Sequence, residues 1–102
     1  MPTKTEQSDL FQVLYGRNGE CPVPVIAACS PADCFNAIIE AFTIATKYMT
    51  PVIMLSDGYI ANGAEPWKVP DVDALPQMTI KHPQGLENGG TFKPYARDER
   101  LA

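Results

Sequence analysis

The sequence predicts an α/β fold, a βαβ parallel-sheet fragment with an N-terminal helix and an extended Pro-rich C-terminal tail. The pattern from residue 23 to residue 57 predicts one strand, one helix and one parallel strand, with no further element in this run. Five of the ten prolines, by contrast, lie beyond residue 60, where no helical period is present. Because two parallel strands do not form a stable sheet by themselves, we expect further chain or a partner to complete the unit.

The two strands are predicted from short apolar runs at residues 25–29 and 52–55, in which apolar and polar residues do not alternate. Such continuous runs are typical of strands that are buried on both faces. Pro22 and Pro24 hold the preceding chain extended and remove two backbone donors, so strand pairing should begin near Val25.

A first helix is expected over residues 4–15. Thr3 and Glu6 have the spacing of a capping box, and Gly16 follows the last apolar positions of the helix. The sequence therefore predicts that this helix begins directly after Thr3 and ends before Gly16.

The helix between the strands has clear start and stop signals. Ser30 is placed as its N-cap, Pro31 at its first position and Asp33 in its first turn, where a negative charge favours the helix dipole. Thr50 and Pro51 end it. An apolar stripe with a 3.6-residue period is predicted at Phe35, Ile38, Ile39, Phe42, Ala45 and Met49.

Composition excludes several classes of partner and location. The net charge is −4, which argues against nucleic acid and against an anionic membrane surface, because both select for basic patches. No apolar run approaches the roughly 20 residues that a membrane span requires, and the start has no apolar segment of a signal peptide. A cytoplasmic location is therefore expected. The three cysteines form no C-x-x-C pair, so we expect reduced thiols rather than disulfides or a zinc site.

Candidate chemistry is confined to the carboxyl ends of the two strands, where parallel α/β sheets bind ligands. Ser30 and Asp33 could flank an anion at the helix start, or they could simply cap the helix. Asp57 could present a carboxylate, or Asp57-Gly58 could simply be a turn. Cys34 could be a thiolate favoured by the helix dipole, or a buried thiol. His82, the single histidine, is expected to be solvated rather than catalytic.

No nucleophile elbow, glycine-rich phosphate loop or metal-ligand spacing is present in the sequence. We therefore assign no catalytic, cofactor-binding or metal-binding residue from the residues alone. Two alternatives remain open on this basis, a thiol enzyme that uses Cys34 and a small protein-interaction module that uses the Pro-rich tail.

Several segments of the chain match a known family. They are P-T-K-T-E-Q-S-D-L from Pro2, Y-G-R-N-G-E from Tyr15, S-P-A-D-C-F from Ser30, L-S-D-G-Y-I-A-N-G from Leu55, Glu65-Pro66-Trp67, and P-Y-A-R-D-E from Pro94. Together they closely resemble the α subunit of 2-oxoacid:ferredoxin oxidoreductases, and are most similar to the 2-oxoglutarate enzyme. The resemblance spans nearly the whole chain.

The resemblance implies a domain organisation and an activity. Residues 1–60 would be the second half of a thiamine-diphosphate pyrimidine-type domain, and residues 61–102 an extended interdomain linker. Members of this family oxidatively decarboxylate a 2-oxoacid to an acyl-CoA and pass the electrons to ferredoxin, with thiamine diphosphate, Mg²⁺ and iron–sulfur clusters in the complex. The resemblance places none of these cofactors on this chain. The implied partners are the β subunit, the rest of the α subunit and ferredoxin.

The resemblance also implies one site residue, the substrate-binding Thr3. In the family, the matching threonine holds the substrate carboxylate together with an arginine from an R-G-G-P-S-T-G run, which precedes the position where this chain begins. The capping box remains the alternative for Thr3. Because that arginine and the neighbouring strands are missing, we expect the isolated chain to be inactive and to form homo-oligomers.

Overall fold

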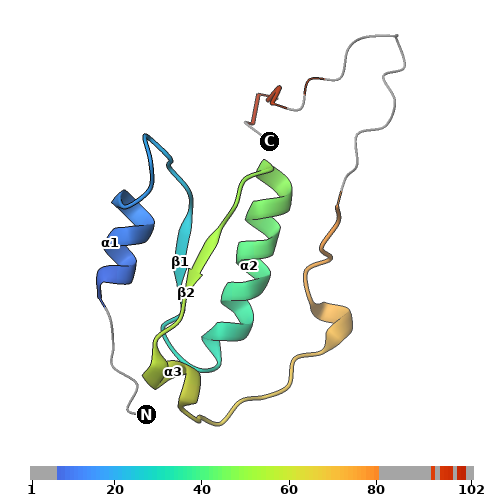
Figure 1. Cartoon of the computed structure of the whole chain (residues 1–102). Helices are drawn as coiled ribbons and strands as arrows, with labels where there is room; N and C mark the ends of the chain where they lie inside the picture. Colours follow the sequence, from blue (N-terminus) through green and yellow to red (C-terminus); the bar gives the residue numbers. More distant parts are fainter. Residues whose placement is uncertain (1–6, 81–92, 94, 98, 101–102) are drawn as a thin grey trace.

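A computed structural model of the chain describes residues 7–80, 93, 95–97 and 99–100, with the elements in the order α1, β1, α2, β2, α3 and η1 (Figure 1). Their bounds are α1 Ser8–Tyr15, β1 Val25–Ala27, α2 Asp33–Tyr48, β2 Ile53–Leu55, α3 Gly58–Asn62 and the 3₁₀ helix η1 Val72–Ala74. The predicted α/β fold with one βαβ unit is confirmed. In the part of the chain that is described, no helix is long and apolar enough to cross a membrane.

The sheet consists of β1 and β2, paired in parallel with Val25 opposite Ile53 and Ala27 opposite Leu55. The Ile53 N–H donates to the Pro24 carbonyl at 3.1 Å and extends the pairing by one bond. Each strand is shorter than its apolar run. At the end of the first run this is because the Cys29 N–H donates to the Asp33 carboxylate at 3.0 Å instead of to a neighbouring strand.

α2 packs against both strands and lies along one face of the sheet (Figure 1). Its buried residues are Ala37 and Ala41, which are 4% and 6% exposed. With Ala28, these are the buried hydrophobic residues of the described chain. The fully buried positions of α2 therefore carry small side chains, which let the backbones approach closely.

The predicted apolar stripe of α2 is covered only in part, since three of its six residues are half-buried and three are exposed. Ile38, Phe42 and Met49 are 53%, 39% and 69% exposed. Because successive residues are about 100° apart around a helix, these three lie on a face adjacent to the one that carries Ala37 and Ala41. The helix is apolar over a wider arc than two strands can cover.

α2 ends at Tyr48 with Met49 in the left-handed conformation, at φ 51° and ψ 44°. The Thr50 N–H donates to the Ala45 carbonyl at 3.3 Å, the bond that closes a Schellman motif. This confirms that Thr50 and Pro51 stop the helix, although the left-handed position is held by methionine rather than by the usual glycine.

α1 begins later than predicted, at Ser8 instead of near residue 4, and its N-cap is Gln7, whose side chain makes no capping hydrogen bond. Thr3 and Glu6 of the predicted capping box lie outside the described residues. The helix ends before Gly16, as predicted, and the Gly16 N–H donates to the Gln12 carbonyl at 2.9 Å. A Cβ on Gly16 would lie 2.8 Å from that same carbonyl, so this position requires glycine.

The apolar side chains of α1 are open to solvent. Leu10 and Leu14 are each 44% exposed and Phe11 is 64% exposed, and no residue of the helix is buried. Phe11 stacks on Tyr15 with ring centroids 6.4 Å apart, which covers part of each ring. α1 therefore presents an apolar face that the described chain covers only in part.

Beyond β2 the structure contains an element that the sequence did not predict. Residues 58–62 form the short helix α3, where we expected only a turn. From residue 63 to residue 80 the described chain carries no element other than η1 and runs past α2 (Figure 1), in agreement with an extended tail.

Replacing Ala41 with leucine should destabilise the chain by about 1–3 kcal/mol, because the extra methylenes would push α2 away from the sheet. Ala61→Leu, at an exposed position of α3, is the matched control and should change the free energy of unfolding by less than about 0.5 kcal/mol. Urea titration followed by helical circular dichroism measures both. Equal losses in the two variants would contradict the packing described here.

Candidate sheet-edge site

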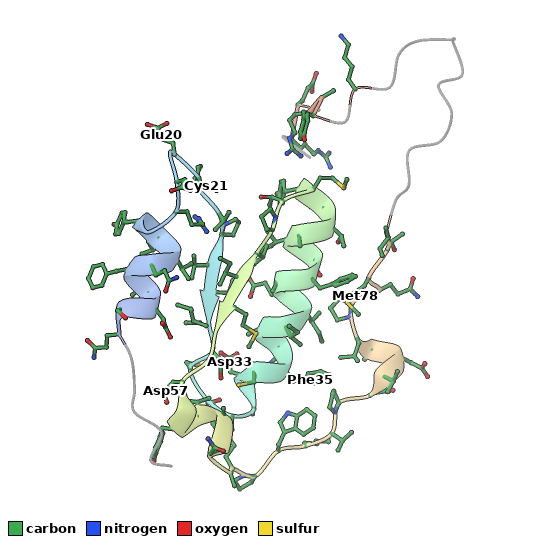
Figure 2. The ribbon with its side chains drawn as sticks, viewed as in Figure 1. Glu20, Cys21, Asp33, Phe35, Asp57 and Met78 are labelled. Atoms are coloured by element: carbon green, nitrogen blue, oxygen red, sulfur yellow. The ribbon has the colours of Figure 1, made fainter. Side chains whose placement is uncertain are left out.

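The candidate site lies at the carboxyl edge of the sheet, where β1 leads into α2 and β2 leads into α3. Figure 2 shows Asp33 and Asp57 at this same end of the sheet, each close to a helix start. Parallel sheets place ligands outside the carboxyl ends of their strands, because loops and helix starts converge there. The question is whether these carboxylates are available to a ligand.

Asp33 is held by the backbone around it. Its N–H donates to the Ser30 hydroxyl at 3.2 Å, and its own Oδ2 accepts from the Cys29 N–H at 3.0 Å. The bond from the Cys29 N–H, and then that from the Cys29 thiol, hold the pKa of the Asp33 carboxyl below its ordinary value. The prediction of Ser30 as the N-cap is wrong, because the N-cap of α2 is Ala32 and the regular helix begins at Asp33 rather than at Pro31. Both side chains nevertheless accept backbone N–H groups near this helix start, Ser30 from Asp33 and Asp33 from Cys29.

Neither cysteine near this edge has the environment of an activated nucleophile. The Cys29 thiol donates to the Asp33 carboxylate, and this bond, together with the negative charge of Asp33, raises the pKa of the thiol. The half-buried Cys34 thiol lies 3.5 Å from the Ser30 carbonyl, toward which it donates. His82, which we expected to be solvated, lies outside the described residues. The contacts of both thiols are those of structural side chains.

Asp57 is the N-cap of α3. Its Oδ1 accepts from the Tyr59 N–H and, at 3.3 Å, from the Ile60 N–H. The Asn62 side-chain amide donates to the Gly58 carbonyl at 2.7 Å. The Asp57 carboxylate thus serves the helix start, and the turn predicted at Asp57-Gly58 is the first turn of a short helix.

A third carboxylate at this edge was not predicted. Glu65, from the chain beyond α3, accepts with its Oε1 from the N–H of Ala32, the N-cap of α2. Two residues later the ring of Trp67 packs on Phe35, with centroids 5.2 Å apart. Because 33 positions separate Ala32 from Glu65, no local pattern could have indicated this contact.

The three carboxylates at the sheet edge share one role, which is to accept backbone N–H groups at helix starts. In the described residues, no three His, Cys, Asp or Glu side chains gather in a way that could hold a metal ion. Thr3, the substrate-binding candidate, lies outside the described residues. The described edge does not fit a thiamine diphosphate or magnesium site, and we derive no catalytic step from it.

Comparison with known proteins decides the family. Residues 1–100 match the family model described as pyruvate flavodoxin/ferredoxin oxidoreductase, thiamine diP-bdg. The chain belongs to this family. The resemblance inferred from the sequence motifs is thereby confirmed, and the match extends through the Pro-rich tail. No solved structure matches the chain.

Three curated relatives illustrate the similarity. The chain is 63% identical over its whole length to 2-oxoglutarate oxidoreductase subunit KorA of Mycobacterium tuberculosis, of which it covers 15%. It is 39% identical, over 74% of its length, to 2-oxoglutarate synthase subunit KorA of Archaeoglobus fulgidus, of which it covers 22%. It is 32% identical over its whole length to 2-oxoacid:ferredoxin oxidoreductase 1, subunit alpha, of Aeropyrum pernix, of which it covers 16%. The chain thus spans less than a quarter of each.

Asp33→Asn should make the chain less stable near neutral pH and less sensitive to acid. A carboxyl whose pKa is lower in the folded chain stabilises the fold above its ordinary pKa of 3.8, and this contribution is lost as the pH falls through the folded pKa. Urea unfolding at about pH 7 and about pH 3 measures the difference, with Asp73→Asn, at an exposed position of η1, as the control. An Asp33 carboxyl that titrates at or above 3.8 by NMR would contradict the capping role.

Proposed function

We propose that the chain is part of the α subunit of a 2-oxoacid:ferredoxin oxidoreductase. The enzyme would oxidatively decarboxylate a 2-oxoacid, in this proposal 2-oxoglutarate, to an acyl-CoA and transfer the electrons to ferredoxin. The observation that carries the proposal is the 63% identity, across the whole chain, to a subunit named for 2-oxoglutarate oxidoreductase. The relative from Archaeoglobus fulgidus is also named for 2-oxoglutarate, which favours this substrate over other 2-oxoacids.

The proposal divides the chain into two parts. Residues 1–60 would form the second half of a thiamine-diphosphate pyrimidine-type domain, and residues 61–102 an extended interdomain linker. The family model, whose description includes thiamine diphosphate binding, spans both parts and supports the first assignment. The near absence of regular structure over the described residues 63–80 supports the second.

The cofactors and partners follow from the same assignment. The parent complex, with a cytoplasmic location, would use thiamine diphosphate, Mg²⁺ and an iron–sulfur cluster, together with a β subunit, the rest of the α subunit and ferredoxin. We assign no cofactor contact to the described sheet edge, because Asp33, Asp57 and Glu65 already accept backbone N–H groups there. Thr3 remains the proposed contact to the substrate carboxylate.

The other two hypotheses find no comparable support. An interaction module would need a tail that is independent of the rest, but the family model extends through the Pro-rich tail to residue 100. A thiol enzyme would need an activated Cys34, whose thiol instead lies against the Ser30 carbonyl. Family membership therefore favours the oxidoreductase.

A segment exchange tests the proposed function. The 102 residues would replace the matching segment of the Mycobacterium tuberculosis relative, which is coexpressed with its β subunit and assayed for reduction of a viologen dye by 2-oxoglutarate, coenzyme A and thiamine diphosphate. Activity near that of the parent supports the proposal, and the isolated chain should show none. An exchanged subunit that assembles normally but lacks turnover would contradict it.

Thr3→Ala in such an active subunit should raise the KM for the 2-oxoacid more than it lowers stability. A hydroxyl bonded to a charged carboxylate contributes about 1.5–3 kcal/mol, whereas a helix cap contributes about 1 kcal/mol. Because the N-cap of α1 is Gln7, a capping role for Thr3 at that helix start has lost its support. Thr43→Ala, at an exposed position of α2, is the control. Unchanged kinetics with a lowered Tm would refute the substrate contact.

The isolated chain should also self-associate. The buried hydrophobic residues in its described part are three alanines, while the larger apolar side chains of α1 and α2 stay in contact with water. Exposed apolar faces and the open edges of a two-stranded sheet recruit other chains, and a second copy is the one always available.

Sedimentation of the purified chain measures this expectation. We expect a dimer or larger species instead of the 11.1 kDa monomer, and Phe42→Glu should shift the distribution toward monomer. Tyr59→Glu, at a side chain that is 87% exposed on α3, serves as the control. A monodisperse monomer that unfolds cooperatively would show that the expectation is wrong.

A further inference from the structure

Glu65-Pro66-Trp67 was recognised in the sequence as part of a family resemblance, but the proposed function gives it no role. In the structure this segment follows α3 and crosses the start of α2, where the tail leaves the βαβ unit (Figure 1). The side chain before the proline contacts the N-cap of α2 and the one after it contacts the first turn, and both contacts join segments that are more than thirty residues apart.

The first contact satisfies a backbone donor. The first N–H groups of a helix have no partner within the helix, and an acceptor there typically stabilises it by about 1 kcal/mol. At this helix start the Ser30 hydroxyl accepts from the Asp33 N–H, and Glu65 adds an acceptor for the N–H of the N-cap residue Ala32. A negatively charged acceptor is also favoured by the helix dipole.

The second contact covers apolar surface. Trp67 is 47% exposed, and its indole packs on Phe35 with the rings tilted by 54°. Phe35 belongs to the side of α2 that the sheet leaves open, so the tail supplies cover that the strands do not. Aromatic pairs at this separation contribute roughly 0.5–1.5 kcal/mol beyond their area burial.

The backbone between α3 and the two contacts is adapted to a close approach. A Cβ on Gly63 would lie 2.9 Å from the Tyr59 carbonyl and 3.3 Å from Cγ of Pro31, so a larger residue would push the chain outward. Pro66 restricts Glu65 to extended backbone and has few conformations of its own to lose. Because the connection is stiff, forming either contact restricts the segment and so lowers the entropic cost of forming the other.

We propose that Glu65-Pro66-Trp67 is a clasp that fixes where the tail leaves the βαβ unit, Glu65 by capping α2 and Trp67 by packing on Phe35. While the clasp is closed, the Ala32 N–H is occupied by the chain's own carboxylate and is not available to an anion from solution. The clasp is a property of this chain's fold, so an experiment can support or refute it without testing the oxidoreductase function.

Three measurements on the 102-residue chain report on the clasp. Trp67 is the one tryptophan, so its fluorescence and its quenching by acrylamide follow this residue alone. Amide hydrogen exchange at Ala32, followed by NMR, reports the hydrogen bond to Glu65. Lys68 provides a trypsin site directly after the clasp, and cleavage after Arg17 in the same digest is the internal reference.

Glu65→Ala should expose Trp67 to acrylamide, speed cleavage after Lys68 relative to Arg17, and accelerate exchange at Ala32 by about fivefold, the effect of losing one helix cap. Glu65→Gln keeps a carbonyl acceptor without the charge and should give smaller changes of the same sign. Glu20→Ala is the matched control, because Figure 2 places Glu20 at the opposite end of the sheet from Asp33 and Asp57.

Two results would overturn the clasp. One is a Glu65→Ala chain with the circular dichroism of the wild type and with unchanged Ala32 exchange and unchanged Trp67 quenching. The other is a wild-type chain whose Ala32 amide already exchanges at the rate of an unstructured peptide. Phe35→Leu separates the two contacts, since it should release Trp67 while leaving a residual hydrogen bond from Ala32 to Glu65.

Discussion

The parallel pairing of β1 with β2 is the constraint on which the described structure depends. Parallel neighbours require a connection that returns the chain to its starting edge, and α2 does this with 16 residues, a length of about 24 Å. Both strands then end at the same edge, so the loops that start α2 and α3 meet there. The candidate site, the caps and the clasp all follow from this arrangement.

Small residues at the contact between α2 and the sheet have a second consequence. Ala37 and Ala41 allow close packing but bury little area, so the hydrophobic contribution of this interface is small. Several larger apolar side chains of α2 lie elsewhere around the helix. Phe35 meets the tail through Trp67, whereas Ile38 and Phe42 stay in contact with water. A helix that is apolar on several sides is suited to the interior of a larger domain, as expected for a chain that spans 15% of a relative.

The sequence was sufficient for the order of α1, β1, α2 and β2, for the parallel pairing of the strands and for the presence of Ser30 and Asp33 at the start of α2. It did not predict α3 or η1. The predicted features depend on local signals, namely apolar runs, a long helical period and side chains that bond to N–H groups within four positions. Local signals could not predict which face of α2 meets the sheet. A helical period identifies the apolar positions, but when these cover a wide arc it does not show which of them are buried. Local signals also could not predict the hydrogen bond between Ala32 and Glu65, because it depends on the path of the chain through α3.

Acidic side chains at a sheet edge have two explanations, a ligand or the needs of the backbone. Asp33, Asp57 and Glu65 all lie where a helix begins. Asp57 and Glu65 accept N–H groups that a helix leaves without a partner, and Asp33 accepts the Cys29 N–H of the loop that leads into α2. Cys29 fits the same account, since its N–H and its thiol both donate to Asp33. The acidic character of this edge therefore follows from two helix starts that meet at one end of a parallel pair, and it requires no ligand to explain it.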